Sequence, residues 1–400
     1  MHLLHIIGSM DPISGGPAQG IRTLDSQMSE MGVIREVVCL DAPDSAYLGR
    51  DKFKIHAIGP AKGRWCYSPN LVGWLKTNIS RFDVVLINGL WLYPSYAVSK
   101  VIKDLKNNHP NERCPRLLVM PHGMLDPYFQ RTKDRRLKAI RNWIYWKLIE
   151  RKVVNDANGL LFTCQTELLL ARETFRPYHP KKEYNVGYGI AAPPPYSEEM
   201  TTAFNAFCPG LNGVPYFLFL SRIHRKKGVD ILIDVYIDMH RSIKSSGGVI
   251  PKLVIAGPGI NTSFGKIIQQ LLLQAPDVSV DVFFPGMLKG DAKWGAFYGC
   301  DAFVLPSHQE NFGIAVVEAL ACAKPVLISN QVNIWREIMS GGGGIIENDD
   351  LNGVQKMLKQ WVNLKSEEKK HMNDNALLTY QNQFTISKFA GNFLRAFIDD

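Results

Sequence analysis

Two carboxylates and a run of free backbone amides could together hold a nucleotide sugar. Glu310 precedes a helical pattern that begins near Gly313, and Glu318 lies inside that helix, roughly 7.5 Å further along its axis. The amides of Asn311, Phe312 and Gly313 and the positive end of the helix dipole favour a bound phosphate. Because a buried carboxylate needs several donors, the paired hydroxyls of a ribose would suit Glu318. The alternative is a structural Glu318 bonded to a neighbouring strand, with Glu310 in solvent.

Two cations on a second loop could bind a diphosphate. Arg222 and Lys227 follow the predicted strand 217–220 and precede another helical pattern. Arginine offers a bidentate fork and lysine a point charge, so the pair could stabilise the negative charge that develops on a departing nucleoside diphosphate. On the local sequence alone we favour the alternative, a basic loop that is exposed to solvent.

A glycine pair near the start of the chain is a weaker candidate. Gly15 and Gly16 come shortly after the predicted strand 2–7, and Pro17 suits the first turn of a helix. Glycine lets the backbone approach a ligand closely, but this loop lacks the lysine and hydroxyl residue of a P-loop.

Two further strand ends carry polar and aromatic residues. His122 follows the predicted strand 116–120, and Asn88 and Trp91 follow the strand 83–87. A lone histidine is more often a structural hydrogen-bonding residue than a catalyst, but ligands of parallel sheets bind beyond the carboxyl ends of the strands. We therefore take His122 as the leading site residue of the first half, and Asn88 as a residue that could orient an acceptor.

The elements that must position these residues alternate between strand and helix. Short β-branched runs alternate with amphipathic stretches twice along the chain, which predicts an α/β protein with two doubly wound parallel sheets that face each other across a cleft. The predicted strands are 2–7, 33–40, 53–58, 83–87, 116–120, 159–163 and 184–186 in the first half, and 217–220, 252–256, 278–284, 302–305, 325–329 and 344–346 in the second.

The proline-rich segment 191–196 marks the boundary between the halves, because it suits neither a helix nor a central strand. We expect a first domain over residues 1–195, a linker over 196–214 and a second domain over 215–383. The last residues, 384–400, are expected to form a helix that returns to the first domain.

The composition excludes several classes of protein. With 46% hydrophobic and 21% charged residues, the chain is a packed globular protein and not a disordered one. Its seven cysteines are scattered without a Cys-x-x-Cys pair, which argues against a disulfide framework or a zinc site. It has no Asp-x-Asp pair, so we expect no metal and no other cofactor. No apolar run is long enough for a signal peptide or a spanning helix, so we expect a cytoplasmic protein.

The net charge of +9 suits anionic partners, and most of it lies in one segment. Residues 130–153 hold nine cations against Asp134 and Glu150, a local charge of +7. A helix over 135–152 would place Leu137, Ile140, Ile144 and Leu148 on one face. Such a helix could hold the protein peripherally at the inner face of an anionic membrane. We favour the alternative, a helix that covers the sheet and exposes its other face to solvent. Nucleic-acid binding is not expected, because no recognised module accompanies the charge.

Taken together, the second-half motifs resemble glycosyltransferase family 4. The resemblance rests on Arg222, Lys227-Gly228, Gly257, Pro285-Gly286-Met287, Pro306-Ser307, Glu310 and Glu318 separated by seven residues, and Lys324-Pro325-Val326. It is most specific over residues 217–346 and covers nearly the whole chain. The resemblance implies the GT-B fold and a retaining transferase. Ala323, where many similar proteins have glycine, is a tolerated departure.

The resemblance also implies roles. It puts Arg222 and Lys227 on the donor diphosphate, Met287 and Leu288 on the nucleobase, and Glu318 on the ribose. Glu310 and the amides of Asn311 to Gly313 would hold the transferred sugar and the β-phosphate. In the first domain, it puts Gly16 near the diphosphate, His122 on the sugar, and Gly15, Asn88 and Trp91 near the acceptor. Similar proteins often have histidine where this chain has Asn88.

We therefore expect a retaining transfer of a hexose, best glucose from UDP-glucose, to a saccharide or a lipid-diphosphate-linked acceptor in polysaccharide biosynthesis. Two alternatives stay open. One keeps the fold but epimerises or hydrolyses the nucleotide sugar. The other is a non-catalytic protein that binds a nucleotide sugar.

Overall fold

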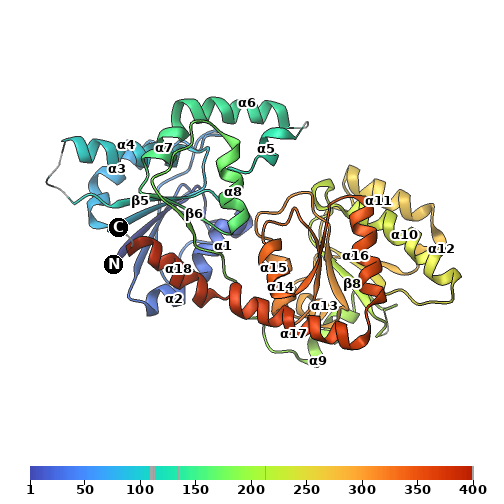
Figure 1. The fold of residues 1–400 in the computed structure, drawn as a ribbon. Coiled ribbons are helices and arrows are strands. Elements are labelled where there is room, and N and C mark those ends of the chain that lie inside the picture. The colour runs from blue at the N-terminus through green and yellow to red at the C-terminus, as the bar shows by residue number, and fades with distance from the viewer. Residues whose placement is uncertain (109–110, 112, 133–134, 212, 399–400) are drawn as a thin grey trace. The chain divides into compact units, whose positions relative to one another are not determined.

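The computed structural model spans the 400 residues and describes all of them except 109–110, 112, 133–134, 212 and 399–400. The chain divides into two compact units. The first is made of Met1–Gly189 with Ile386–Asp400, and the second is Ile190–Thr385. Each unit has its own parallel sheet covered by helices (Figure 1).

The first unit is built on a seven-stranded sheet in the order β3-β2-β1-β4-β5-β6-β7, and each pair of neighbours is parallel. The order reverses between β1 and β4, so the chain winds outward in both directions from that point. The strands are β1 His2–Ile6, β2 Ile34–Cys39, β3 Lys54–Ala57, β4 Val84–Asn88, β5 Arg116–Met120, β6 Gly159–Phe162 and β7 Glu183–Asn185.

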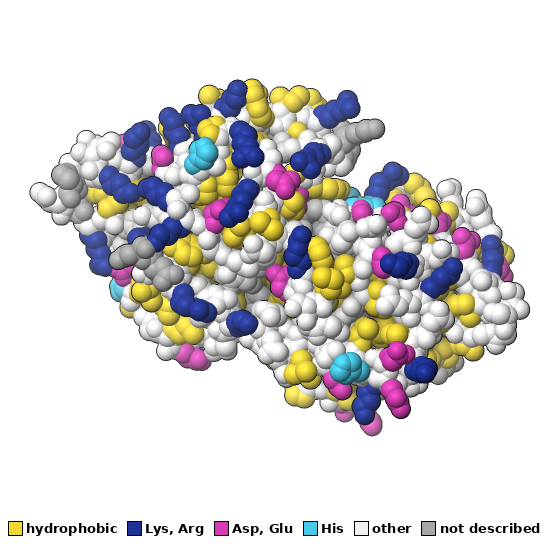
Figure 2. Space-filling view, in the orientation of Figure 1, with side chains coloured by type: hydrophobic (Ala, Val, Ile, Leu, Met, Phe, Trp, Pro, Cys, Tyr) yellow, Lys and Arg dark blue, Asp and Glu magenta, His cyan; other side chains and the backbone are white. Residues whose placement is uncertain are grey.

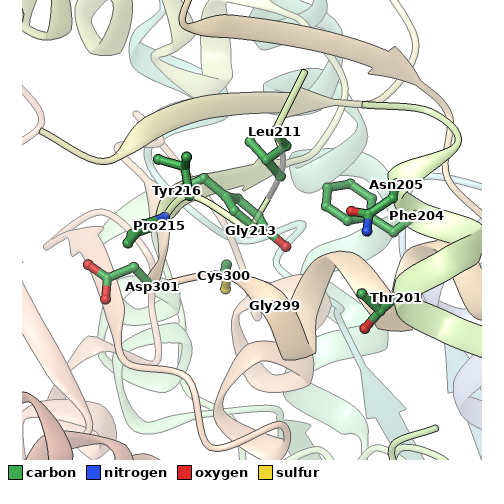
Figure 3. Close-up of a pocket in the computed structure, with 12 residues that line it drawn as sticks. Thr201, Phe204, Asn205, Leu211, Gly213, Pro215, Tyr216, Gly299, Cys300 and Asp301 are labelled. Carbon is green, nitrogen blue, oxygen red and sulfur yellow. The ribbon is translucent and has the colours of Figure 1, made fainter. Parts of the chain in front are cut away.

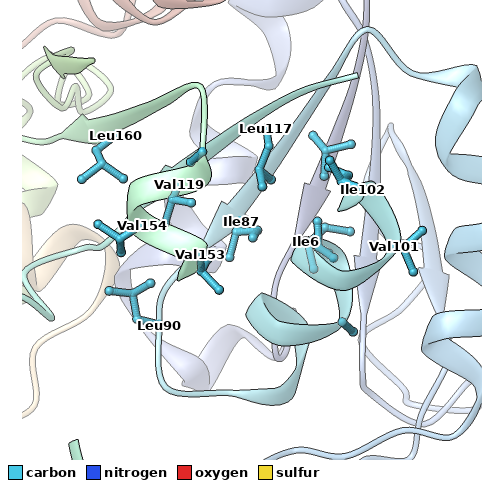
Figure 4. Packing of buried hydrophobic residues seen from close by; sticks show 14 of the residues in the cluster. Ile6, Ile87, Leu90, Val101, Ile102, Leu117, Val119, Val153, Val154 and Leu160 are labelled. Carbon is cyan, nitrogen blue, oxygen red and sulfur yellow. The ribbon is translucent and has the colours of Figure 1, made fainter. Parts of the chain in front are cut away.

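Helices cover this sheet, and β-branched and leucine side chains fill the space between. Figure 4 shows part of the core, in which strand residues pack against α4 and α7 (Ile6, Ile87, Leu117 and Val119 against Val101, Ile102, Val153 and Val154). The helices are α1 Gly16–Thr23, α2 Asp25–Glu30, α3 Asn70–Asn78, α4 Tyr93–Asn108, α5 Tyr128–Arg131, α6 Arg136–Tyr145, α7 Arg151–Asp156, α8 Gln165–Thr174 and α18 Ile386–Ile398. A π-helical turn, Trp146–Glu150, joins α6 to α7.

The second unit has a six-stranded parallel sheet in the order β10-β9-β8-β11-β12-β13. The order reverses between β8 and β11, which are hydrogen-bonded neighbours. The strands are β8 Tyr216–Leu220, β9 Lys252–Ala256, β10 Val282–Gly286, β11 Ala302–Leu305, β12 Val326–Ser329 and β13 Gly344–Glu347.

Nine helices of the described residues surround this second sheet, and side-chain caps start several of them. Thr262 accepts a hydrogen bond from the amide of Gly265 at the start of α11, and Asp350 does the same for Gly353 in α16. The helices are α9 Glu198–Asn205, α10 Val229–Ser245, α11 Ser263–Leu273, α12 Pro276–Ser279, α13 Gly290–Gly299, α14 Ile314–Ala321, α15 Trp335–Gly341, α16 Leu351–Asn363 and α17 Ser366–Gln383.

The predicted fold class is confirmed, since both sheets are parallel and doubly wound. One predicted strand was wrong at its start: residues 278–279 belong to α12, because Pro276 opens a helical turn there, and β10 begins only at Val282. Residues 196–214, expected as a linker, include α9, which packs closely on α13. A Cβ atom on Gly295 of α13 would lie 2.0 Å from the carbonyl oxygen of Met200.

Candidate functional site

Lys227 and Glu310 meet where the strand order of the second unit reverses. Lys227 ends the loop after β8, Glu310 lies in the loop after β11, and the Nζ of Lys227 donates a hydrogen bond to Oε2 of Glu310. The reversal point of a doubly wound sheet is where such folds bind ligands. The structure thus brings together a cation and a carboxylate that the sequence analysis placed on two separate loops.

Contacts between the two loops fix this pair. The Lys226 carbonyl accepts hydrogen bonds from Oγ of Ser307 at 3.0 Å and from the amide of His308 at 2.8 Å. Gly228 follows with a φ of +67°, and a Cβ atom there would lie 2.1 Å from the carbonyl oxygen of Pro306. Only glycine fits this approach, so Gly228 sets the position of Lys227 relative to the second loop.

The backbone of Glu310 is held on its other side by the loop after β12. Its amide donates to the carbonyl of Gln331 at 2.9 Å, and its carbonyl accepts from the amide of Asn333 at 2.9 Å. The side chain therefore leaves from a fixed backbone, which is what a residue that orients a reacting group needs.

The loop after β8 concentrates positive charge. Burial, together with the charges of Lys226 and Arg222, lowers the pKa of Lys227 to about 7. Arg222 itself is exposed. Lys227 has one carboxylate partner but lies beside two other cations, so a second anion that binds here raises its pKa.

Helix α14 presents its amino end beside Glu310. Gly313 precedes the helix with a φ of +79°, and no side chain caps it. Phe312 is buried with its ring 5.7 Å from that of Phe384. The segment Asn311 to Gly313 is therefore anchored by an apolar side chain, while the first helical amides lack a side-chain cap.

Glu318, in the middle of α14, is bonded to a helix. Nζ of Lys293, in α13, donates to Oε1 of Glu318 at 2.6 Å. Burial raises the pKa of Glu318, and the charge of Lys293 opposes that effect. The sequence alternative of a bond to a neighbouring strand was wrong. Lys293 was missed altogether, because a single lysine in α13 carries no pattern that sets it apart.

Met287 and Leu288 directly follow β10, two strands away from the reversal point. The Met287 side chain is 55% exposed and Leu288 is buried. One therefore offers an accessible surface to a ligand, while the other can contribute only its backbone.

In the first unit, a chain of polar groups, of which His5 and Asn88 are buried and His122 is half-buried, joins three strands at the reversal point. Nε2 of His122 lies 3.3 Å from Oδ1 of Asn88, and Nδ2 of Asn88 lies 3.3 Å from Nδ1 of His5. His122 has a φ of +52°, which a residue with a side chain rarely adopts. Burial lowers the pKa of His122 to about 4, so its imidazole is neutral near pH 7. His5 was not singled out from the sequence, because it lies within an apolar strand.

Gly15, the first residue of the glycine pair, also adopts a conformation that glycine permits. Gly15 has a φ of +93° with open space around it, and α1 begins at Gly16. The Gly16 carbonyl accepts a hydrogen bond from the hydroxyl of Tyr188 at 3.0 Å. Tyr188 thus joins this loop to the segment that follows β7.

Trp91 is held in a left-handed conformation by a buried carboxylate. Its φ is +71°, and its amide donates to Oε1 of Glu150 at 2.7 Å. Oγ of Ser95 donates to the same oxygen at 2.7 Å. Burial raises the pKa of Glu150 to about 7, and the two hydrogen bonds oppose that rise. In the sequence Glu150 counted only as an acidic residue among cations, so its structural role was missed.

The basic segment covers the sheet with a different face from the one expected. Asn142, Trp146 and Glu150 are buried, whereas the apolar residues of the other face are exposed, from 43% for Ile144 to 84% for Leu137, with Ile140 and Leu148 between these values. The favoured sheet-covering prediction was therefore wrong for this apolar stripe. Figure 2 shows basic and hydrophobic side chains side by side over α6. Lys133 and Asp134 lie outside the described residues, and no helix among those described is long and apolar enough to span a membrane.

A cavity of about 270 Å³ in the second unit lies at the edge of the sheet opposite to Lys227 and Glu310 (Figure 3). Tyr216 and Asp301 line it, and they stand at the amino ends of β8 and β11. Lys227 and Glu310 follow the carboxyl ends of the same strands. We therefore do not place a donor in this cavity.

Comparisons with known proteins agree on the second unit. Residues 209–378 match the family model described as "Glycosyl transferases group 1". An uncharacterized glycosyltransferase of Methanocaldococcus jannaschii is 31% identical over 149 residues, 36% of each chain. The O-antigen chain mannosyltransferase C of Escherichia coli is 27% identical over 179 residues, 43% of each chain. The matched region thus spans less than half the length of these relatives.

Solved structures match along the whole chain. Sucrose-phosphate synthase from Thermosynechococcus elongatus superposes with a TM-score of 0.70 and 15% identity, covering 99% of this chain and 98% of that one. HepE from Anabaena, solved in complex with UDP-glucose, gives 0.68 and 14%, covering 99% of both. WaaG, a glycosyltransferase involved in lipopolysaccharide biosynthesis, gives 0.65 and 13%, covering 100% of both. These likenesses show the GT-B fold.

Proposed function

We propose that this chain, whose residues 209–378 match the group 1 glycosyltransferases, transfers a hexose from a nucleotide sugar, with retention of configuration, in polysaccharide biosynthesis. The observation that carries the proposal is the meeting of Lys227 and Glu310 at the strand reversal point, beside the uncapped start of α14. Buried positive charge, a helix start without a side-chain cap and a fixed carboxylate are what a departing nucleoside diphosphate and its sugar require.

Substrate binding exchanges one partner for another at Lys227. Without donor, its ammonium group contacts Glu310, and its pKa is lowered by burial. The donor diphosphate replaces Glu310 as the partner of Lys227 and carries more negative charge. Arg222 contacts the same diphosphate as a second cation. Glu310 is then released to accept hydrogen bonds from the hydroxyls of the transferred sugar. The Lys227–Glu310 contact thus keeps both groups paired until the donor arrives.

The reaction we propose is a front-face substitution. The bond between the anomeric carbon and the β-phosphate oxygen breaks, and the electron pair leaves with the diphosphate. The acceptor oxygen forms its bond on the same face, and its proton passes to an oxygen of the departing phosphate. Arg222, Lys227 and the α14 amides stabilise the charge that develops on the leaving group. No covalent intermediate on a carboxylate is needed.

The remaining roles follow the family resemblance. Glu318 binds the ribose in place of Lys293, and the segment Met287–Leu288 lies against the base. Gly16 approaches the diphosphate, and neutral His122 contacts the sugar as a hydrogen-bonding group and not as an acid.

We assign Gly15, Asn88 and Trp91 to the binding of the acceptor, which is a saccharide or a lipid-diphosphate-linked saccharide. The amide of Asn88 already bonds to two imidazoles. Besides its proposed contact with the acceptor, Asn88 therefore holds His122 in place.

For the donor we propose UDP-glucose. HepE, which has the same fold, was solved with that molecule. A thermal-shift panel of UDP-, GDP- and ADP-sugars tests the proposal, because a ligand that binds the folded state raises its melting temperature. The largest rise is expected with UDP-glucose. A panel in which no nucleotide sugar raises the melting temperature would contradict the proposed function.

We also propose that the α6 segment contacts an anionic membrane surface. Its exposed apolar stripe runs from Leu137 to Leu148, and cations at Arg136, Lys138 and Lys147 border it on both sides. Such a helix lies in the plane of a membrane interface, with its apolar side chains among the lipids and its cations on the headgroups. The protein would then be peripheral at the membrane that carries its acceptor.

A further inference from the structure

A pocket of about 300 Å³ lies in the first unit, between the loop after β4 and the helices α5 and α6. Three guanidinium groups line it, those of Arg64, Arg135 and Arg141. Its remaining lining is mostly apolar and comes from the loop 90–92, Met124 and Phe129. Carboxylates are absent from the described residues that line it.

The positive charge of this pocket is not neutralised within the described part of the chain. Among the described residues, no carboxylate forms an ion pair with Arg64, Arg135 or Arg141. Nε of Arg135 is buried and has no hydrogen-bond partner among those residues, while its guanidinium carbon lies 4.8 Å from the centre of the Phe129 ring. Three cations around one cavity repel one another unless an anion joins them.

Arg141 is positioned by a buried neighbour. Its Nη2 and Nε donate to Oδ1 of Asn142 at 2.9 and 3.3 Å, and Asn142 is 5% exposed. The amide of Asn142 therefore holds the guanidinium in one orientation. A guanidinium that is oriented in advance loses less entropy when it binds a phosphate.

We propose that this pocket binds the phosphate or diphosphate group of the acceptor, and that its apolar wall contacts the first carbon atoms of a lipid chain. The proposal rests on the proposed function and adds Arg64, Arg135 and Arg141 to the acceptor site. Arginine forks match phosphate oxygens, and an apolar wall beside them selects a ligand that is anionic at one end only.

The helix α6 connects the pocket to the membrane surface. Arg141 lines the pocket, and the exposed residues Ile140 and Ile144 on the same helix belong to the apolar stripe. The anionic head of a lipid-linked acceptor lies at the depth at which such a helix rests. A lipid phosphate is therefore a better occupant than a phosphate on a free sugar.

Isothermal titration calorimetry tests this with three probes: farnesyl diphosphate, inorganic diphosphate and farnesol. Saturating UDP is present throughout, so that the probes cannot bind in the donor site. The affinity of each chain for UDP is measured beforehand in the same sample. The test variant replaces Arg64, Arg135 and Arg141 by Gln. A matched control replaces Lys100, Lys103 and Lys106 of α4 by Gln, which removes the same charge from the same unit.

We expect the wild-type chain and the control to bind farnesyl diphosphate more tightly than the other two probes. The triple arginine variant should lose affinity by about tenfold for each guanidinium, with its melting temperature and UDP affinity unchanged. Equal binding of inorganic and farnesyl diphosphate would contradict the lipid source. Farnesyl diphosphate binding that survives in the arginine variant, or that is absent in the wild type, would overturn the site. Absence of UDP binding would instead count against the proposed function.

Discussion

Nζ of Lys227 contacts Oε2 of Glu310 across the point at which the strand order of the second sheet reverses. The contact joins the loop after β8 to the loop after β11, and the two strands are direct neighbours. A cation that is buried beside two other cations and one carboxylate is prepared for a second anion. This single pair therefore links the topology of the sheet to the proposed chemistry.

Donor affinity should depend on pH through Lys227. Its pKa in the free chain is lowered to about 7, and a bound diphosphate raises it. Affinity for UDP is therefore steady below about pH 7 and falls as the pH rises above it, because binding must then take up a proton. Titration calorimetry from about pH 6 to 9 measures this. The variant Lys227→Arg stays charged and should bind UDP with less pH dependence. Identical profiles for the two chains would contradict the assignment.

Replacing Gly228 should disturb the site more than replacing another left-handed glycine. In Gly228→Ala, the new Cβ atom meets the Pro306 carbonyl at 2.1 Å, in addition to the strain of a φ of +67°. Gly247→Ala is the control, since its φ is +76° and nothing lies within 4 Å. The control should cost about 1 kcal/mol of unfolding free energy and Gly228→Ala several times more. Equal losses in urea denaturation would show that the close approach is unimportant.

Much of this arrangement could be predicted from the sequence, and the reasons differ by residue. The strands were readable because most are short apolar runs between turns, so the sheets and the residues at their carboxyl ends followed. Family resemblance singled out Arg222, Lys227, Glu310 and Glu318, whereas the local pattern alone favoured a solvated basic loop for the two cations and left the two carboxylates open. Their mutual contacts depend on strand order, which pattern alone does not give.

Other residues carried no signal. Lys293 and Glu150 act through partners 25 and 59 residues away in the chain, and neither stands in a motif. The α6 segment misled because an apolar stripe on a helix usually faces a core. Here the face that carries Trp146 and Glu150 is buried instead. The sequence of the helix alone does not show which of its two faces packs on the sheet.

Glu150 should make stability depend on pH. Its pKa is raised from 4.5 to about 7 in the folded chain, so the folded state holds a proton that the unfolded state releases. The unfolding free energy therefore falls as the pH rises from about 4.5 to 7, by about 3 kcal/mol in total. Glu150→Gln keeps an oxygen for Trp91 and Ser95 but does not titrate.

Urea denaturation of both chains at about pH 5 and pH 8 measures this difference. The wild type should lose more stability than Glu150→Gln between the two values. Parallel changes in the two chains would show that Glu150 has an ordinary pKa.

Membrane contact should depend on both parts of the α6 surface. Replacing Leu137, Ile140, Ile144 and Leu148 by Ser should abolish flotation with vesicles that contain anionic lipid, because these exposed side chains supply the apolar contact. Neutralising Arg135, Arg136, Lys138 and Arg141 should weaken flotation and remove its dependence on salt. Undiminished flotation of both variants would refute the contact, and the α4 triple-lysine variant is the control for lost charge.

The most direct test of the central claim is turnover of UDP-glucose by variants of one loop. Arg222→Ala and Lys227→Ala should each lose about 100-fold or more of the rate, because each removes a cation that stabilises the departing diphosphate. Arg225→Ala removes a cation from the same loop and should stay near the wild-type rate. If both Arg222→Ala and Lys227→Ala turn over UDP-glucose as fast as Arg225→Ala, these residues do not act on the leaving group and the account is wrong.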